Sequence, residues 1–203
     1  MRSPSGSQRV SDNQLRSYPF ASEVIAAEDV RSRVSELGVA IAEDYRGRNP
    51  VFVTVLTGSV LFSADLIRAI DVEVEVDFLA LNRFGDSGRI SVSMDVSRSI
   101  DDRDVVIVED IIDTGLTLNV LRQMMHDRGA RSVATVGLLD KTRRRVTDVP
   151  IEYRGFEVGD EFIVGYGLDW EGLYRNLPSM WAILDIEGFV KDPEILARKV
   201  FAE

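Results

Sequence analysis

The sequence predicts an α/β protein whose twisted parallel sheet is flanked by helices. Continuous apolar runs rich in β-branched residues, such as Val51–Leu56 and Asp104–Val108, are typical of buried strands. These runs alternate with segments of helical periodicity, which is the order of a parallel sheet with right-handed crossovers. A chain of 203 residues that is 45% hydrophobic is long enough for a sizeable core and favours one domain.

The first half of the chain supplies two expected helices and two strands. Apolar residues recur at helical spacing from Ser22 to Tyr45, with Ser22 as the expected N-cap. The Val51–Leu56 strand follows, and then a second helical pattern from Leu61 to Ile70. Val72–Leu81 alternates apolar and acidic residues at first, so we expect a strand that begins with one face in water.

The middle of the chain contains a long polar segment and then a regular strand–helix–strand unit. Asn82–Arg103 is polar and weakly β at Ile90–Val96, and a loop of this length in a compact domain is usually functional or disordered. After the Asp104–Val108 strand, the pattern predicts a helix over Leu116–Asp127 and a strand over Ser132–Leu139.

The pattern changes after Pro150 to short strands, expected at Ile151–Phe156, Phe162–Tyr166 and Trp181–Leu184. We interpret residues of about 150–184 as a small β-rich hood subdomain beside the main sheet, followed by a terminal helix over Asp192–Phe201. Residues 1–17 are Ser-rich and polar and are expected to be a flexible tail, which leaves residues 18–203 as the single domain.

Composition excludes several classes of function. The net charge of −10 makes the chain a poor general binder of nucleic acid, which requires clustered Lys and Arg. The short basic run Lys141–Arg145 is interpreted as a solvated loop. The sequence contains no run of eighteen uncharged apolar residues, so it predicts no membrane-spanning helix and we expect no membrane partner. The absence of cysteine excludes disulfides and thiolate metal sites and fits a cytoplasmic protein.

The segment Val105–Thr117 carries the clearest chemistry. Glu109 and Asp110 follow a buried strand, where ligands bind in open parallel sheets, and sugar hydroxyls would donate to such carboxylates. The next residues, Asp113–Thr117, are small and hydroxylated and lead into a helix, so their N–H groups and hydroxyls would form a phosphate cradle. Together they match a ribose 5-phosphate. The alternative is an ordinary turn with a solvent-facing acidic end.

At this point the sequence resembles a known family. Val105–Thr117 is similar to the phosphoribosyl-diphosphate-binding motif of type I phosphoribosyltransferases, and other segments resemble the hypoxanthine-guanine branch. These segments are, in chain order, Leu56–Ser59, Val76–Phe78, Leu138–Lys141, Asp160–Trp170 and Tyr174–Pro178. The resemblance implies the type I phosphoribosyltransferase fold and purine salvage, in which hypoxanthine or guanine reacts with 5-phosphoribosyl 1-diphosphate to give IMP or GMP plus diphosphate. It also implies Mg²⁺ as cofactor and a homodimer or homotetramer.

The resemblance assigns a role to residues in the base half of the site. Asp113 would handle the proton on purine N7, although the same residue could instead be the N-cap of the following helix. Lys141 would donate to O6, which is an acceptor in hypoxanthine and guanine but an amine in adenine. Phe162 would stack on the base, and the backbone of Ile163 would bond its edge; by pattern alone both are core strand residues.

The resemblance also assigns the donor half. Glu109 and Asp110 would bind the ribose hydroxyls, and a larger set would hold the 5-phosphate through the turn: Asp113, Thr114, Gly115, Leu116 and Thr117. Thr57, Gly58 and Arg175 would contact the diphosphate. Asp169, with Glu109 and Asp110, would hold the Mg²⁺, because this cation suits a few carboxylates, waters and substrate phosphates.

Two departures from the family pattern lie on the leaving-group side. Thr57 stands where a Lys or Arg is usual, so some neutralising charge is lost. Arg83-Phe84 stands in the expected mobile loop where a Ser-Tyr pair is usual, and we hypothesise that Arg83 partly replaces the missing cation. Two other functions remain open. One is the same scaffold acting on xanthine or an unusual base, and the other is a non-catalytic nucleotide-sensing regulator.

Overall fold

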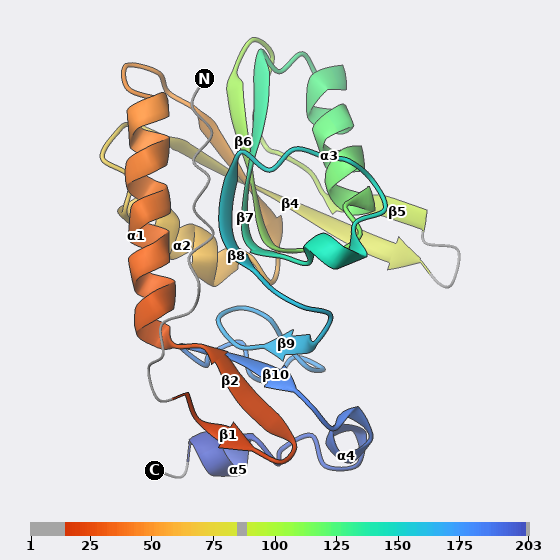
Figure 1. The fold of residues 1–203 in the computed structure, drawn as a ribbon. Coiled ribbons are helices and arrows are strands. Elements are labelled where there is room, and N and C mark those ends of the chain that lie inside the picture. The colour runs from red at the N-terminus through yellow and green to blue at the C-terminus, as the bar shows by residue number, and fades with distance from the viewer. Residues whose placement is uncertain (1–14, 85–88, 202–203) are drawn as a thin grey trace.

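The structure, a computed structural model, describes residues 15–84 and 89–201 and contains two β-sheets (Figure 1). The large sheet has six strands, and every neighbouring pair in it is parallel except β4 and β5. In spatial order these strands are β5 (Arg89–Met94), β4 (Glu75–Phe84), β3 (Val51–Leu56), β6 (Asp104–Ile112), β7 (Ser132–Asp140) and β8 (Tyr153–Glu157).

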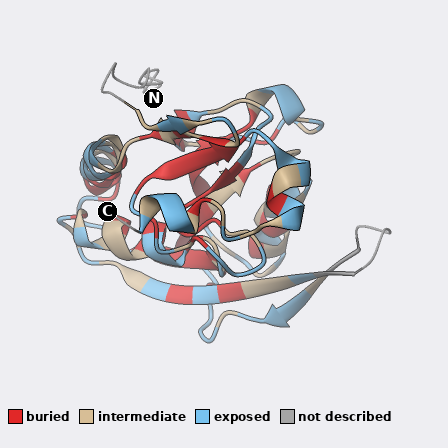
Figure 2. Ribbon diagram, turned by 90° about the horizontal axis from the view of Figure 1, so that it is seen from below, coloured by how far each residue is buried: buried red, intermediate tan, exposed pale blue. Residues whose placement is uncertain are grey.

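Helices cover both faces of this sheet. The helices α1 (Ala27–Asp44) and α2 (Val60–Arg68) share a core with Phe52, Val106 and Val108, while α3 (Leu116–Asp127) packs on the other face. The buried strands between these layers are red in Figure 2. Successive strand residues point to opposite faces, so a strand that is buried on both sides must be apolar throughout. This explains the continuous apolar runs and confirms the predicted α/β fold class.

The start of the chain differs from the prediction. Ser22 was expected to cap a helix, but it lies in strand β2 (Ala21–Ile25), and α1 begins five residues later. The residues of β2 alternate between buried and partly buried, which is a period of two. Over so short a stretch, Val24 and Ile25 fit either period, and pairing with a distant strand decides between them.

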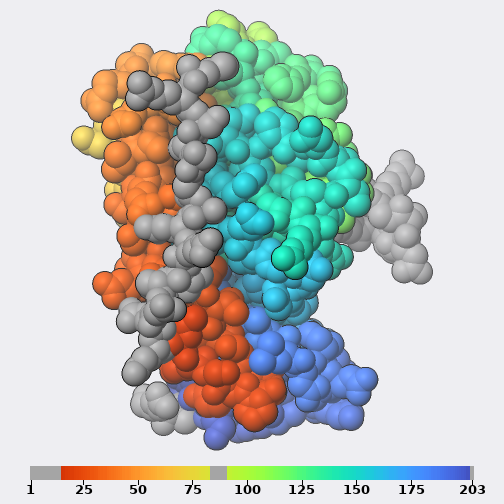
Figure 3. All heavy atoms as spheres, in the orientation of Figure 1, coloured from red at the N-terminus to blue at the C-terminus, as the bar shows by residue number. Residues whose placement is uncertain are grey.

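The small sheet is antiparallel and joins the two ends of the chain. Its strands, in spatial order, are β1 (Ser17–Tyr18), β2, β10 (Met180–Ile183) and β9 (Phe162–Val164). Figure 3 shows these N-terminal and C-terminal segments side by side in the lower part of the molecule. We refer to this sheet and the loops that join its strands as the hood.

Two boundaries of the hood differ from expectation. The strand predicted at Ile151–Phe156 is β8, which pairs with β7 in the large sheet rather than in the hood. Pairing in the hood begins at Ser17, inside the segment expected to be a tail, and the remainder of that segment, residues 1–14, lies outside the described residues.

The C-terminal segment forms two short helices, not the single helix predicted over Asp192–Phe201. These are α4 (Ile186–Lys191) and α5 (Ala197–Val200). Asp185 caps α4 by accepting a hydrogen bond from the N–H of Gly188 at 2.9 Å. Pro193, which lies between the two helices, has no N–H to donate and disfavours a helical residue before it. Within residues 15–84 and 89–201, no helix is both long and apolar enough to cross a membrane.

Candidate active site

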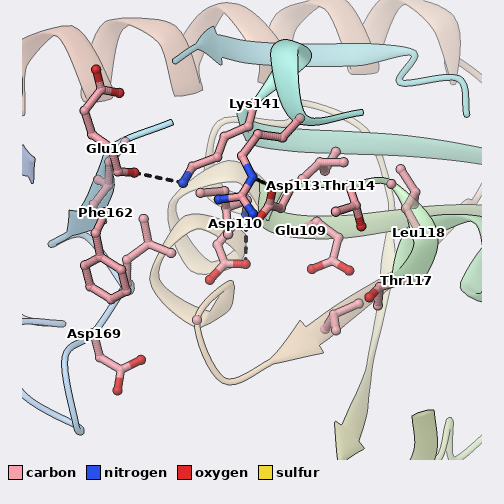
Figure 4. A pocket seen from close by; sticks show the side chains of 18 of the residues that line it. Glu109, Asp110, Asp113, Thr114, Thr117, Leu118, Lys141, Glu161, Phe162 and Asp169 are labelled. Atoms are coloured by element: carbon pink, nitrogen blue, oxygen red, sulfur yellow. Dashed lines mark hydrogen bonds and ion pairs between the residues drawn. The ribbon is translucent and has the colours of Figure 1, made fainter. Parts of the chain in front are cut away.

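A cleft of about 920 Å³ lies between the hood and the carboxyl ends of β3, β6 and β7 (Figure 4). This is where open parallel sheets bind ligands. Most of the predicted site residues line it, namely Gly58, Glu109, Asp110, Asp113, Thr114, Gly115, Thr117, Lys141, Phe162, Ile163 and Asp169. Residues separated by more than a hundred positions in the sequence therefore meet in one cavity.

Two acidic residues, Glu109 and Asp110, lie near the carboxyl end of β6 and line the cleft. Glu109 is 8% exposed, and the backbone N–H of Asp110 donates to the Ser59 hydroxyl at 2.9 Å. Burial raises the pKa of the Asp110 carboxyl, an effect that the Ile111 N–H and Arg175 oppose. A buried carboxylate with a raised pKa is an acceptor that a donor group of a ligand would stabilise.

The loop after β3 packs directly against this acidic end. A Cβ atom on Gly58 would lie 1.7 Å from Asp110 Oδ2, and one on Gly167 would lie 2.0 Å from the Gly58 carbonyl oxygen. Only glycine therefore fits at either position without a shift of the backbone or of Asp110. The Leu56-Thr57 peptide bond is cis. The Thr57 side chain is exposed and, of the two predicted residues in this loop, only Gly58 lines the cleft.

The predicted phosphate cradle is the turn from β6 into α3. Gly115 is the N-cap of α3 and has a φ of 82°, a left-handed conformation that favours glycine. Because the N-cap position is taken by Gly115, the interpretation of Asp113 as the N-cap is wrong. The N-terminus of α3 and the hydroxyls of Thr114 and Thr117 lie at the cleft, and the Thr114 hydroxyl accepts from the Leu116 N–H at 3.4 Å. Leu116 itself is exposed and does not line the cleft.

The basic run after β7 is only partly solvated, whereas a solvated loop was predicted. Lys141 is 6% exposed, and its Nζ donates to the carbonyl oxygen of Glu161 at 2.8 Å. Arg145 donates to the buried Asp140 carboxylate at 2.7 Å. Arg144 Nε lies 2.9 Å from Asp113 Oδ1, inside the cleft. Arg144 was not among the predicted site residues, although the short basic run Lys141–Arg145 contains it.

The hood supplies an aromatic wall to the cleft. Phe162 is 41% exposed, and its ring meets Trp170 edge-on with centroids 5.1 Å apart. Trp170 in turn meets Phe189 of α4 edge-on at 5.4 Å. Ile163 is buried opposite Ala182. Ile186 of α4 also lines the cleft, and no signal in the sequence had placed it there.

The last predicted pair, Asp169 and Arg175, forms an ion pair of 2.8 Å between Asp169 Oδ1 and Arg175 Nη2. Asp169 Oδ2 also accepts from the Gly172 N–H at 2.7 Å. Among the described residues, no group of three or more acidic or His side chains could hold a metal ion by itself. The separate carboxylates of the cleft suit a cation that keeps waters and substrate oxygens as its other ligands.

The predicted mobile loop is described only in part. Arg83 and Phe84 end β4, where their backbones pair with Ile90 and Arg89 of β5. Their side chains and residues 85–88 lie outside the description. The proposal that Arg83 replaces a cation missing at Thr57 therefore stays a hypothesis.

Comparison with known proteins gives the same family by three routes. A model of the phosphoribosyl transferase domain matches residues 21–171. Hypoxanthine-guanine phosphoribosyltransferases from Streptococcus thermophilus (strain CNRZ 1066) and Bacillus subtilis (strain 168) are 44% and 42% identical over 159 residues, which are 76% of this chain and 88% of either relative.

A crystal structure of a hypoxanthine-guanine phosphoribosyltransferase from Bacillus anthracis has a TM-score of 0.77 to this chain. It is 39% identical, and the match covers 80% of this chain and 96% of that one. The shared segment includes the acidic end of β6, the turn into α3 and the strand β9. The chain therefore belongs to the phosphoribosyltransferase family, within the hypoxanthine-guanine phosphoribosyltransferase branch.

Proposed function

We propose that this chain is a Mg²⁺-dependent enzyme of purine salvage. It would convert hypoxanthine or guanine and 5-phosphoribosyl 1-diphosphate into IMP or GMP and diphosphate. One observation carries the proposal: a helix N-terminus, then carboxylate acceptors, then a buried lysine with an aromatic ring line the cleft, which is the order in which such a nucleotide presents its phosphate, its ribose hydroxyls and its base.

The donor half would hold the sugar and phosphate. Glu109 and Asp110 accept hydrogen bonds from the ribose hydroxyls, while the α3 N-terminus and the hydroxyls of Thr114 and Thr117 bind the 5-phosphate. With the sugar fixed, its C1 becomes electron-poor as the bond to the diphosphate breaks. Catalysis then comes mainly from orientation and from charges already in place.

The base half would select a 6-oxopurine. Lys141 Nζ, which now donates to the Glu161 carbonyl oxygen, has further N–H groups for the O6 of the base. Phe162 stacks on the ring, and the Ile163 backbone bonds its edge. Asp113 accepts the N7 proton as N9 attacks C1, and proton transfer to a placed carboxylate contributes to the rate.

The charge balance of the cleft supports the cofactor assignment. Six acidic residues line the described cleft against two basic ones; the acids are Glu109, Asp110, Asp113, Asp160, Glu161 and Asp169, and the bases are Lys141 and Arg144. A diphosphate would not bind well to such a surface without added positive charge. Bound Mg²⁺ would neutralise the leaving diphosphate, held by Asp169 and by Glu109 or Asp110, with Arg175, Thr57 and Gly58 close to the same oxygens.

We also propose that the chain forms an oligomer and acts in the cytoplasm. The family resemblance favours a homodimer or homotetramer, and the substrates would be small molecules found in the cytoplasm. The hood would close over the base.

An assay with each base tests the proposed function. The purified chain is mixed with 5-phosphoribosyl 1-diphosphate and hypoxanthine, guanine, xanthine or adenine, and nucleotide formation is followed by ultraviolet absorbance. We expect turnover with hypoxanthine or guanine that stops on addition of EDTA and returns with excess Mg²⁺. Turnover only with xanthine would transfer the proposal to that base, and nucleotide binding without turnover would indicate a regulator.

A further inference from the structure

The ion pair between Arg144 and Asp113 joins two elements that the proposed reaction uses separately. Arg144 is the last residue of the short 3₁₀ helix η1 (Thr142–Arg144), and Asp113 follows the end of β6. Their side chains are 46% and 41% exposed, and both line the cleft. In the ligand-free molecule, the guanidinium therefore lies against the carboxylate that would accept the proton of the base.

The contact is an ion pair without hydrogen-bond geometry. Arg144 Nε lies 2.9 Å from Asp113 Oδ1, yet this buried oxygen has no hydrogen-bond donor aimed at it among the described residues. Oδ1 thus keeps its capacity to accept a proton while the guanidinium covers it. A base that donates to Oδ1 therefore competes with the Arg144 guanidinium for the same oxygen.

The backbone of Arg144 is fixed even though its side chain is half exposed. Before it, the Lys141 N–H donates to the Ile112 carbonyl oxygen at 2.9 Å. After it, Arg145 is held by Asp140, and the Val146 N–H donates to the Thr114 carbonyl oxygen at 3.0 Å. The segment that carries Arg144 is therefore tied to the phosphate cradle on one side and to the base-binding lysine on the other.

We propose that Arg144 is a positioning residue that couples the two halves of the cleft, an inference that rests on the proposed function. While the cleft is empty, Arg144 pairs with Asp113 and covers Oδ1. When the donor binds, the guanidinium transfers to the 5-phosphate, and Asp113 becomes available to the base.

The relative strength of the two contacts gives the direction of this exchange. An ion pair between half-exposed side chains contributes little, so it is easily broken. A phosphate offers more charge and more acceptor oxygens to a planar guanidinium than one carboxylate oxygen does. The cradle begins at Thr114, the residue directly after Asp113, so the competing anion would bind next to the existing partner.

The neighbouring Arg143 is a matched control. It lies in the same short helix and is exposed, and it does not line the described cleft. Arg143→Ala removes the same charge from the same turn as Arg144→Ala. Arg144→Lys keeps the charge and loses the planar fork, so it separates charge from geometry.

The test is calorimetric titration of the full chain with its preferred base, hypoxanthine or guanine, with and without saturating ribose 5-phosphate, which carries the phosphate but no leaving group. We define the coupling factor as the ratio of the two dissociation constants of the base. We expect a factor of at least ten for the wild type and Arg143→Ala, and a factor at least fivefold smaller for Arg144→Ala. Arg144→Lys should recover part of it, and the KM for the donor should rise at least fivefold in Arg144→Ala.

Equal coupling factors in Arg143→Ala and Arg144→Ala would overturn the inference while leaving the proposed function intact, provided that the wild type turns over its substrates. If the wild type neither turns over nor binds a 6-oxopurine under any of these conditions, the proposed function fails and this inference fails with it. Thermal unfolding of each variant checks that the fold is retained.

Discussion

The two ends of strand β6 carry the same kind of residue in opposite surroundings. At the amino end, the Asp104 side chain is fully buried and accepts from Arg131 Nη2 and Ser132 Oγ, both at 2.6 Å, and from Arg48 Nε at 2.8 Å. These donors hold the pKa of Asp104 well below its usual range. At the carboxyl end, burial instead raises the pKa of Asp110.

This difference separates a stabilising end from a functional end. The amino end surrounds its carboxylate with matched cations, so the folded state stabilises the charge. The carboxyl end concentrates acidic groups beside a cleft, which stabilises the free protein less and favours the binding of a ligand or cation there. Acidic side chains at the two ends of one strand should therefore respond in opposite ways to substitution.

The largest effect is expected at the functional end. Glu109→Ala should lower kcat/KM for the donor by about 100-fold, which corresponds to about 2.7 kcal/mol, because hydrogen bonds from ribose hydroxyls to a charged acceptor are lost. The free energy of unfolding should stay the same or rise slightly, since one of two adjacent like charges is removed. Steady-state kinetics and urea unfolding measure the two quantities. A Glu109→Ala variant that loses stability but keeps full activity would show that Glu109 stabilises the fold and does not serve the reaction.

Asp104→Asn should do the opposite. It should lower the free energy of unfolding by about 2 kcal/mol and leave kcat within twofold. This is less than for a fully buried pair, because Arg48 and Arg131 are 44% and 51% exposed. Folding lowers the pKa of Asp104, so the charged form stabilises the native state above the pKa of the unfolded chain.

The stability difference between the wild type and Asp104→Asn should therefore be complete above about pH 5 and shrink as the pH falls below about 4, the ordinary pKa of an aspartate. Urea unfolding across this range measures the difference. A difference that grows toward low pH would contradict the assignment of Asp104 as a charged, stabilising residue.

Candidate site residues could be predicted from the sequence where they lie in one continuous segment. The acidic end of β6 and the turn through Thr117 could be interpreted directly, because strand, turn and helix signals follow one another there. The base half is assembled from the end of β7, the start of β9 and the C-terminal helix α4. Only the family resemblance predicted Lys141 and Phe162, and nothing predicted Arg144 or Ile186.

The failures share a physical cause, which is that pairing between distant segments overrides local pattern. Ala21–Ile25 became a strand because it pairs with Met180–Ile183, more than 150 residues away. The run Lys141–Arg145 appeared fully solvated because two of its partners, the Asp113 carboxylate and the Glu161 carbonyl, come from other parts of the fold.

A substitution of Asp113 tests whether the functional end of β6 takes part in proton transfer from the base. Asp113→Asn should lower turnover by at least tenfold, about 1.4 kcal/mol, because an amide cannot take up the N7 proton. Donor affinity should change little, since in the proposed function the backbone of this turn and the hydroxyls of Thr114 and Thr117, which line the cleft, would bind the phosphate. Single-turnover kinetics with saturating donor measure the chemical step. Unchanged turnover would remove Asp113 from the reaction.

The smallest effect on stability is expected at Asp95, an exposed acidic residue that pairs with an arginine. Asp95 follows β5 and accepts from both Nη atoms of Arg128, at 2.5 and 2.9 Å, which lowers the pKa of Asp95, yet its side chain is 52% exposed. Water and salt screen such a pair, so Asp95→Asn should lower the free energy of unfolding by less than about 1 kcal/mol.

Urea unfolding of Asp95→Asn and Asp104→Asn at low and high salt measures how strongly salt screens each carboxylate. The small loss in Asp95→Asn should fade in high salt, while the loss in Asp104→Asn should largely persist, because a buried carboxylate is screened less. Equal losses at both sites would mean that pairing with arginine alone, and not burial, makes the amino end of β6 stabilising. Burial would then no longer explain why the two ends of this strand differ.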